Sequence, residues 1–123
     1  TFLSFPGGSG NDSGHGIAVD GSGNVFVTGY IWYEFTATPS NDAFAARFSA
    51  SSGALTNNYM FGDNGGQDYG NGIAVRNGTA YVTGDSTVAW GSPKRDFTTA
   101  GGKDALVAKV YFFSQLYLPL VIR

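Results

Sequence analysis

The chain contains the same pattern twice, and this repeat limits the architectures open to it. The sequence GHGIAVDGSGNVFVTG at 14–29 returns as GNGIAVRNGTAYVTG at 70–84, and DAFAARF at 42–48 returns as DALVAKV at 104–110. The copies are 56 residues apart in the first segment and 62 apart in the last, so the differences in length fall between the matching segments. Insertions confined to connections are typical of a structural repeat. We therefore expect two similar structural units.

Each unit is predicted to contain four short β-strands. Val, Ile, Thr, Tyr and Phe fill the segments between glycines, and these residues favour strands. GIAV, the first strand of each copy, is a short apolar run that predicts a nearly fully buried strand. TFLSF at 1–5 is expected to be one extra strand, the counterpart of NNYMF at 57–61. The expected strands are 16–19, 24–29, 42–48 and 57–61 in the first copy, and 72–75, 79–84 and 104–110 in the second.

The composition favours an all-β fold and excludes several function classes. The chain has 19 Gly and 15% aromatic residues, but 13% charged residues and a single Glu, so good helix formers are scarce. A net charge of −2 offers no basic surface for nucleic acid. Without cysteine the chain forms no disulfide or thiolate metal site. It also contains no run of about 18 apolar residues, so no membrane span is expected.

A four-stranded antiparallel unit repeated at this spacing is typical of a β-propeller blade. Residues 5–48, with GGSGND, GHGIAVDGSGNVFVTG and DAFAARF, resemble the glycine-rich SBBP β-propeller repeat of large secreted bacterial proteins. Residues 61–110 resemble it through QDYGNGIAV, YVTG and DALVAKV. The resemblance implies a secreted or cell-surface protein with several blades, and it assigns no catalytic residue to this chain.

We expect one repeat domain over 1–123, divided by blade. Residues 1–13 would form the last strand of a preceding blade and the following loop, 14–69 the first blade, and 70–123 the second blade with an apolar tail. Propellers close with about four to eight blades, so two blades would leave apolar faces uncovered. Either other chains complete the ring, or the sequence is the carboxyl end of a longer propeller. The strand expected at 1–5 favours the second alternative.

Polar residues in the glycine-rich connections are expected to have structural roles. Asp12 and Asp68 occupy equivalent loops, where an Asp side chain accepts hydrogen bonds from the loop backbone. Calcium binding is the alternative role for these two carboxylates. Asn77-Gly78 is a strong signal for a two-residue hairpin turn.

A second turn has a weak likeness to a calcium loop. Asp20, Ser22 and Asn24 alternate as the ligands of an EF-hand do, but Val25 and Ile31 stand where that loop needs Gly and Glu. We therefore expect Asp20 and Asn24 to stabilise a turn and expect no metal site.

No catalytic group is apparent. His15 is the only histidine, and its counterpart in the second copy is Asn71. No Cys, second His or G-x-S-x-G turn accompanies it, so a catalytic triad has no support. Nothing singles out a carboxylate pair among the nine acidic residues. We expect His15 to be a loop residue and the chain to be neither an enzyme nor a cofactor-binding protein.

The connections at 30–41 and 85–103 differ most between the copies. The candidate binding residues there are Trp32, Tyr33, Trp90, Lys94 and Arg95. In a blade these connections emerge at the same end as the loops of Asp12 and Asp68. Their aromatic side chains would stack on sugar rings or anchor a protein partner, or would instead cap the core between blades.

The tail VYFFSQLYLPLVIR at 110–123 is strongly apolar. It contains Pro119, which cannot donate to a β ladder, so the tail suits an edge strand or a cover. An exposed apolar strand is also a template for pairing with another chain. The expected assembly residues are Phe112, Phe113, Leu116, Tyr117, Leu118, Leu120, Val121 and Ile122.

Together these features predict a non-catalytic structural or adhesive module of a secreted or cell-surface protein. Its partner would be protein, either copies of itself in a homo-oligomer or polymer, or the rest of a longer chain. The alternative is carbohydrate binding through Trp32, Tyr33 and Trp90. A third possibility, a hydrolase using His15 or loop carboxylates, ranks lowest.

Overall fold

The computed structural model describes residues 1, 3, 6–7, 10–33, 40–62, 65–88 and 102–112, with only the backbone of Tyr33. Within these residues the chain forms β-strands and no helix, so the all-β prediction is confirmed. The strands are β1 (Ser13–Val19), β2 (Val25–Tyr33), β3 (Ser40–Phe48), β4 (Leu55–Phe61), β5 (Asp68–Arg76), β6 (Thr79–Ser86) and β7 (Asp104–Tyr111).

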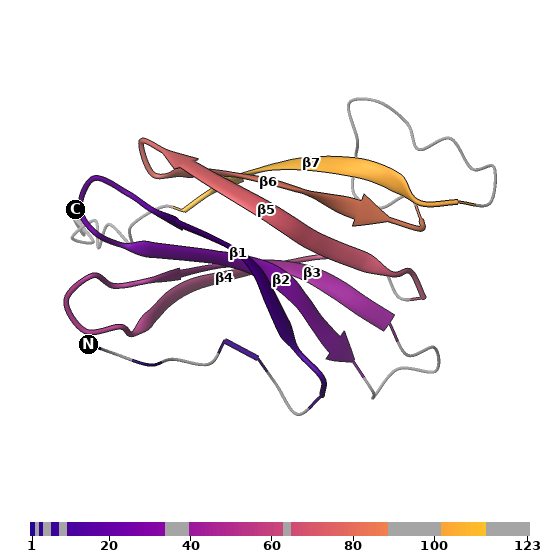
Figure 1. The fold of residues 1–123 in the computed structure, drawn as a ribbon, viewed down its shortest axis with the longest axis horizontal. Coiled ribbons are helices and arrows are strands. Elements are labelled where there is room, and N and C mark those ends of the chain that lie inside the picture. The colour runs from indigo at the N-terminus through magenta and orange to yellow at the C-terminus, as the bar shows by residue number, and fades with distance from the viewer. Residues whose placement is uncertain are drawn as a thin grey trace, which may run out of the picture.

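The strands form two sheets, each a simple antiparallel meander. The first sheet has the order β1-β2-β3-β4 and the second has the order β5-β6-β7. Figure 1 shows them as two layers that cross at an angle. We call the first sheet blade 1 and the second blade 2. Blade 1 has the four antiparallel strands that the repeat predicts.

Two expected strands fall wholly or partly outside the described residues. The fourth strand of blade 2 was expected in the tail, and residues 113–123 are not described. Of the extra strand expected at 1–5, only Thr1 and Leu3 are described, and neither belongs to a strand. Blade 2 also begins earlier than expected, since β5 starts at Asp68 rather than at residue 70.

Both blades carry a β-bulge at the same repeat position. The register of the β1–β2 pair shifts at His15, and that of the β5–β6 pair shifts at Asn71. Each is the extra residue that a bulge inserts opposite the partner strand. The expectation that His15 lies in a loop is therefore wrong, because the residue is part of β1.

The bulges explain the glycine that ends the repeated VTG sequence. A Cβ atom on Gly29 would collide with the backbone carbonyl oxygen of Ser13, and one on Gly84 would collide with that of Tyr69. The bulged strand thus approaches its neighbour so closely that a side chain has no room at these two positions.

The turns follow the chemistry of their residues. Asn77 and Gly78 have φ angles of 51° and 71°, as a two-residue type I′ hairpin requires. In the β1–β2 turn, the Oδ1 atom of Asp20 accepts the backbone N–H groups of Ser22 and Asn24, both at 2.9 Å. These two bonds stabilise the turn between β1 and β2.

One face of blade 1 packs on one face of blade 2, and this contact forms the main core. Phe26 on β2 stacks edge-on against Phe112, with ring centroids 5.2 Å apart. The core comprises Phe26, Ala45, Phe61, Ile73, Val75, Ala80, Val82, Ala108, Val110 and Phe112. A second buried group lies on the opposite face of blade 1 and comprises Ile31, Phe44, Ala46 and Phe48.

The prediction that GIAV would be nearly fully buried is wrong. β1 is the edge strand of its sheet, and its alternate residues point to opposite faces. Gly16 faces blade 2, where the backbone of Gly72 approaches it closely. Ile17 and Val19 point to the other face, and both are mostly exposed. Gly16 and Ala18 are partly buried and no residue of the strand is fully buried, because only one of its faces is covered.

Phe112 was expected to belong to an exposed assembly tail, and it does not. Its side chain is buried, with the ring edge-on to both Phe26 and Tyr59. Its backbone N–H donates to the carbonyl oxygen of Gly78 at 3.3 Å. Phe112 therefore closes the core between the blades, because it is the first residue after β7 and continues that strand's direction.

Candidate functional site

The contact between the blades can be compared with the outer faces of the chain position by position, because the blades are repeats. We call the face of blade 1 that packs on blade 2 its forward face, and keep that name for the equivalent face of blade 2. The opposite face of each blade is its rear face. In the structure, the forward face of blade 1 contacts the rear face of blade 2 (Figure 1).

Four forward-face residues of blade 1 are completely buried. Phe26, Thr28, Ala43 and Ala45 each have 0% of their surface exposed. The hydroxyl of Thr28 donates to the carbonyl oxygen of Phe44 at 2.6 Å, which satisfies it inside the contact. The guanidinium of Arg47 lies 6.0 Å from the centre of the Phe26 ring.

The equivalent residues of blade 2 are open. Tyr81 is 42% exposed and Val107 is 81% exposed, and Thr83 is exposed as well. The local geometry is nevertheless the same, since Lys109 Nζ lies 5.8 Å from the centre of the Tyr81 ring, as Arg47 does over Phe26. Blade 2 thus presents a forward face like that of blade 1, and its central side chains are exposed to solvent.

On the rear faces, the residues of blade 2 are the buried ones, and their equivalents in β1 of blade 1 are exposed. Ile73 and Val75 of blade 2 pack against the core between the blades. Their equivalents in blade 1, Ile17 and Val19, are 70% and 60% exposed. The rear face of blade 1 is therefore open along its edge strand β1 and buried over β3, where Phe44, Ala46 and Phe48 lie, whereas the forward face of blade 2 is open over both β6 and β7.

A shallow apolar depression lies on the forward face of blade 2. Its volume is about 300 Å³. It is lined by Gly72, Ile73, Ala74, Tyr81, Val82, Thr83 and Val107. An apolar depression of this kind accepts an aliphatic side chain.

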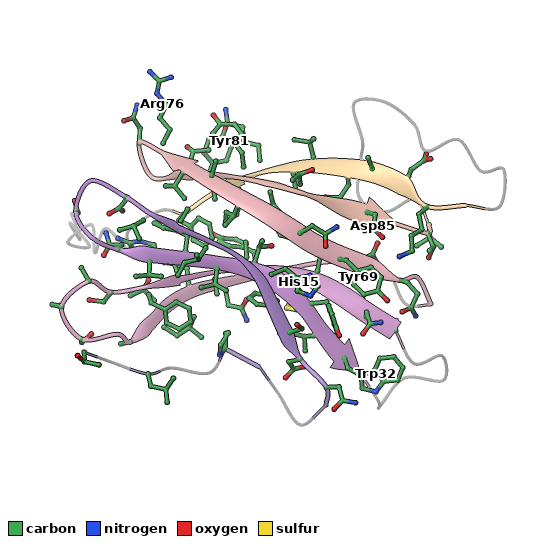
Figure 2. All side chains as sticks on the ribbon, viewed as in Figure 1. His15, Trp32, Tyr69, Arg76, Tyr81 and Asp85 are labelled. Carbon is green, nitrogen blue, oxygen red and sulfur yellow. The ribbon has the colours of Figure 1, made fainter. Side chains whose placement is uncertain are left out.

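The candidate aromatic binding residues are only partly within the described part of the chain. Trp32 is half-buried, its backbone N–H donates to Asp12 Oδ1 at 3.1 Å, and its indole lies against Gly10. The side chain of Tyr33 and the residues Trp90, Lys94 and Arg95 are not described. Figure 2 shows Trp32 near the end of β2. The structure thus joins Trp32 to the loop of Asp12, which leaves less of its ring available for stacking.

The other turn residues are engaged in local structure. Asp68 is completely buried at the start of β5, opposite Ser86, rather than in a loop as expected. Asn24 Nδ2 donates to Asp20 Oδ2 at 2.9 Å. Partial burial raises the pKa of Asp20, but its hydrogen bonds from Asn24 and Ser22 outweigh this and keep the pKa below its ordinary value. Among the described residues, no three His, Cys, Asp or Glu side chains are grouped to hold a metal ion.

A polar network crosses between the blades, and the sequence pattern did not reveal it. His15 Nδ1 lies 3.3 Å from Asn71 Oδ1, Asn71 Nδ2 donates to Asp85 Oδ1 at 2.9 Å, and Lys103 pairs with Asp85 Oδ2 at 2.9 Å. Burial raises the pKa of Asp85, but the Lys103 ammonium and the Asn71 amide together lower it below its ordinary value. Figure 2 shows His15, Tyr69 and Asp85 in the same region of the molecule.

A second set of bonds ties β3 to the start of blade 2. Asn41 Nδ2 donates to Gln67 Oε1 and also to the Tyr69 hydroxyl, the latter at 2.9 Å. The Tyr69 ring stacks edge-on against Tyr30, with centroids 5.1 Å apart. For the His15–Asn71 contact, the alignment of the two copies was the one signal in the sequence, because it places these two residues at equivalent positions.

The described part of the chain includes no helix that could cross a membrane. Searches for similar proteins found no match among curated proteins or solved structures. Residues 7–35, which include β1, its turn and β2, match the family model of the SBBP beta-propeller repeat. The resemblance expected from the sequence is therefore confirmed over residues 7–35, where the chain is similar to an SBBP β-propeller repeat.

Proposed function

We propose that this chain is a non-catalytic structural module of a secreted or cell-surface protein, and that it binds protein through the open forward face of blade 2 and the exposed side chains of β1 on blade 1. The observation that carries this proposal is the contrast between equivalent positions. Phe26 and Ala45 are completely buried between the blades, whereas Tyr81 and Val107 are open to solvent. A propeller blade normally has another blade on each side, and in the described part of the chain each of the two sheets packs on one other sheet.

The exposed apolar side chains give the association its driving force. Complete burial of one Val, Leu or Ile side chain contributes about 1.5–3 kcal/mol. Ile17, Val19, Tyr81 and Val107 are all large apolar residues with 42% or more of their surface exposed. Burying these four side chains would contribute several kcal/mol, a large fraction of the whole stability of a small domain, which is about 5–15 kcal/mol.

The family similarity supports the location and the non-catalytic role. SBBP repeats are structural repeats and occur typically in extracellular bacterial proteins. The only histidine, His15, is placed against Asn71 and Tyr30. Glycan binding through Trp32, Tyr33 and Trp90 has less support, because the indole of Trp32 is half-buried against Gly10.

The experiment compares the mass in solution of the wild type with that of the double variant I17E/V107E. Both positions are exposed strand positions, so the variant should fold, which circular dichroism checks. We expect concentration-dependent association of the wild type and a 12.9 kDa monomer for the variant, by sedimentation or light scattering.

Two matched variants complete this experiment. S22E places the same charge in an exposed turn away from both faces, and W32A removes the aromatic candidate. Both should associate as the wild type does. A folded wild-type monomer at all concentrations would overturn the proposal, and loss of association in W32A but not in I17E/V107E would favour the loop aromatics instead.

A further inference from the structure

We infer that the forward face of blade 2 binds an extended acidic segment of another protein, with an aliphatic side chain in the apolar depression and carboxylates on Lys109 and Arg76. This inference rests on the proposed function for the choice of face and adds the chemistry of the partner. It is carried by the charges of this face, which differ from those of the equivalent buried face of blade 1.

The side chains of the forward face of blade 2 lie in three rows across the sheet. Alternate residues of a strand project from one face, and cross-strand partners lie side by side. Consecutive rows are therefore about 7 Å apart. The registers of β5, β6 and β7 give a first row of Gly72, Thr83 and Val107, a second of Ala74, Tyr81 and Lys109, and a third of Arg76, Thr79 and Tyr111. Along the strands the face thus changes from apolar to basic.

The two cations of this face are accessible. Lys109 is exposed, and its Nζ lies 5.8 Å from the centre of the Tyr81 ring and 4.9 Å from that of the Tyr111 ring. Arg76 is exposed as well, and Figure 2 shows it with Tyr81 on the side of blade 2 that is turned away from blade 1. Among the residues that the structure describes, no carboxylate forms an ion pair with either cation. Both positive charges are therefore available to a partner.

Blade 1 balances the equivalent charges within its own sheet. The two copies align Arg76 with Asp20 and Lys109 with Arg47. Burial raises the pKa of Asp20, but hydrogen bonds within its turn and the nearby charge of Arg47 lower it. The equivalent positions thus hold one acid and one base in blade 1, and two bases in blade 2.

This difference disfavours another blade as the occupant. Inside the chain, the forward face of blade 1 packs on the aliphatic side chains of Ile73 and Val75. The same contact on blade 2 would cover Lys109 and Arg76 with aliphatic side chains and no anion. Burying a charge without a partner is costly. A partner that carries carboxylates avoids this cost.

A second copy of the chain is a poor source of these carboxylates. In the part of the chain that the structure describes, every Asp is buried or half-buried, and no Glu occurs there. The exposed apolar side chains still allow the isolated chain to self-associate, but that contact leaves both cations without a carboxylate. A segment of another protein with exposed Asp or Glu supplies the missing charge.

The apolar depression makes a protein segment the fitting ligand. Tyr81 and Val107 line it, and Lys109 follows Val107 by two residues on β7. The ligand therefore needs an aliphatic group about 7 Å from a carboxylate, which residues i and i+2 of an extended peptide provide. Acidic polysaccharides have the carboxylate but no aliphatic side chain. The pattern Ile-x-Glu-x-Glu matches the depression, Lys109 and Arg76 in turn.

The test titrates a peptide of this pattern into the full chain. The probe is acetyl-Thr-Ile-Thr-Glu-Thr-Glu-Thr-amide, and NMR follows the amide chemical shifts of the isotope-labelled protein. We expect the shifts to centre on Tyr81 and Val107, and binding to weaken as salt is added, because exposed charge pairs are screened. Two control peptides, one with Gln in place of both Glu and one with Gly in place of Ile, should each bind about tenfold more weakly.

The double variant R76Q/K109Q tests the two cations, and S22E/S51E is its matched control. Both variants change the net charge by the same amount, but S22E/S51E places the change in exposed turns of blade 1. R76Q/K109Q should bind the peptide about tenfold more weakly, and S22E/S51E should bind it as the wild type does. Self-association, measured by sedimentation, should persist in R76Q/K109Q, because it does not use the cations.

The outcomes separate this inference from the proposed function. If the wild type self-associates but does not bind the peptide, or if R76Q/K109Q binds it as tightly as the wild type, the acidic partner is wrong and the role of the open face stands. If the wild type neither self-associates nor binds the peptide, both are wrong. Equal or tighter binding of an oligogalacturonate, which has carboxylates and no aliphatic side chain, would overturn the assignment to protein.

Discussion

His15 and Asn71 occupy the same position in the two repeats and contact each other, with His15 Nδ1 3.3 Å from Asn71 Oδ1. Each is the extra residue of the β-bulge in the first strand of its blade. A bulge re-aims a side chain and increases the local twist, and here it brings the two side chains together where the blades meet. The β-bulge that both repeats contain thus produces a contact between the two blades.

Replacing His15 with Ala should change stability only slightly. The side chain is exposed, and it loses one long polar contact and an edge-on contact with Tyr30, so we expect a loss of at most about 1 kcal/mol in the free energy of unfolding. Urea denaturation checks this. Loss of a measurable hydrolytic activity in H15A would contradict the non-catalytic role.

The repeat offers a matched pair of threonines. Thr28 is buried and its hydroxyl donates to Phe44 at 2.6 Å, whereas the hydroxyl of Thr83 is exposed and donates to Leu106 at 3.3 Å. T28V should cost about 1–3 kcal/mol, because it leaves a buried carbonyl oxygen without this donor. T83V should cost less than about 0.5 kcal/mol. Equal losses in the two variants would contradict the burial difference between the blades.

Phe112 should be critical for the fold. It is buried between Phe26 and Tyr59, so F112A should lose about 3–5 kcal/mol of stability. Y111A, one residue earlier and 49% exposed, is the control and should lose much less. The thermal midpoints of the two variants test this. A stable F112A protein would restore the view that residue 112 belongs to an exposed tail.

The hairpin glycine should resist substitution for conformational reasons alone. Gly78 has a φ of 71°, and an added Cβ would have its nearest neighbour at 4.0 Å, so space does not limit the site. G78A should cost about 1–2 kcal/mol, because an L-residue is strained in the left-handed region. G21A is the control, since Gly21 has open space around it and no positive φ. Equal stability of G78A and G21A would contradict this prediction.

The Asp85–Lys103 pair predicts a small acid dependence of stability. Because the pKa of Asp85 is lowered on folding, the ionised carboxylate stabilises the fold above its ordinary pKa of 3.8 and loses this effect as the pH falls through the lower folded value. D85N should therefore be less stable than the wild type at pH 7, and the difference should shrink below about pH 4.

The size of this effect is limited by solvent. The side chains of Lys103 and Asp85 are 55% and 26% exposed, so the pair should contribute less than about 1 kcal/mol. Denaturation of wild type and D85N at pH 7 and pH 2.5 gives the comparison. A difference between the two proteins that does not change with pH would contradict the role of the carboxylate.

Local residue patterns were enough to predict the strands and several turns. Alternating β-branched and aromatic residues gave β2, β3, β6 and β7 to within a few residues at most ends, and Asn77-Gly78 gave its hairpin. These features depend on neighbours in the sequence, since strand formation and turn geometry follow from side chains within a few residues. The repeat predicted the four-stranded blade and the family resemblance, because segments of similar sequence form similar structural units.

Which face of each sheet is buried could not be predicted from local patterns, because it depends on contacts between residues that are distant in the sequence. GIAV occurs identically in both copies, yet Ile73 packs against the core and Ile17 is mostly exposed. The difference is not in the segment but in whether another blade lies beside it. Phe112 likewise entered the core because β7 ends beside Phe26, and His15 became a strand residue because one inserted position shifts the register of a ladder. Burial depends on how the sheets pack, so the same four-residue segment contributes to the core in one blade and has exposed apolar side chains in the other.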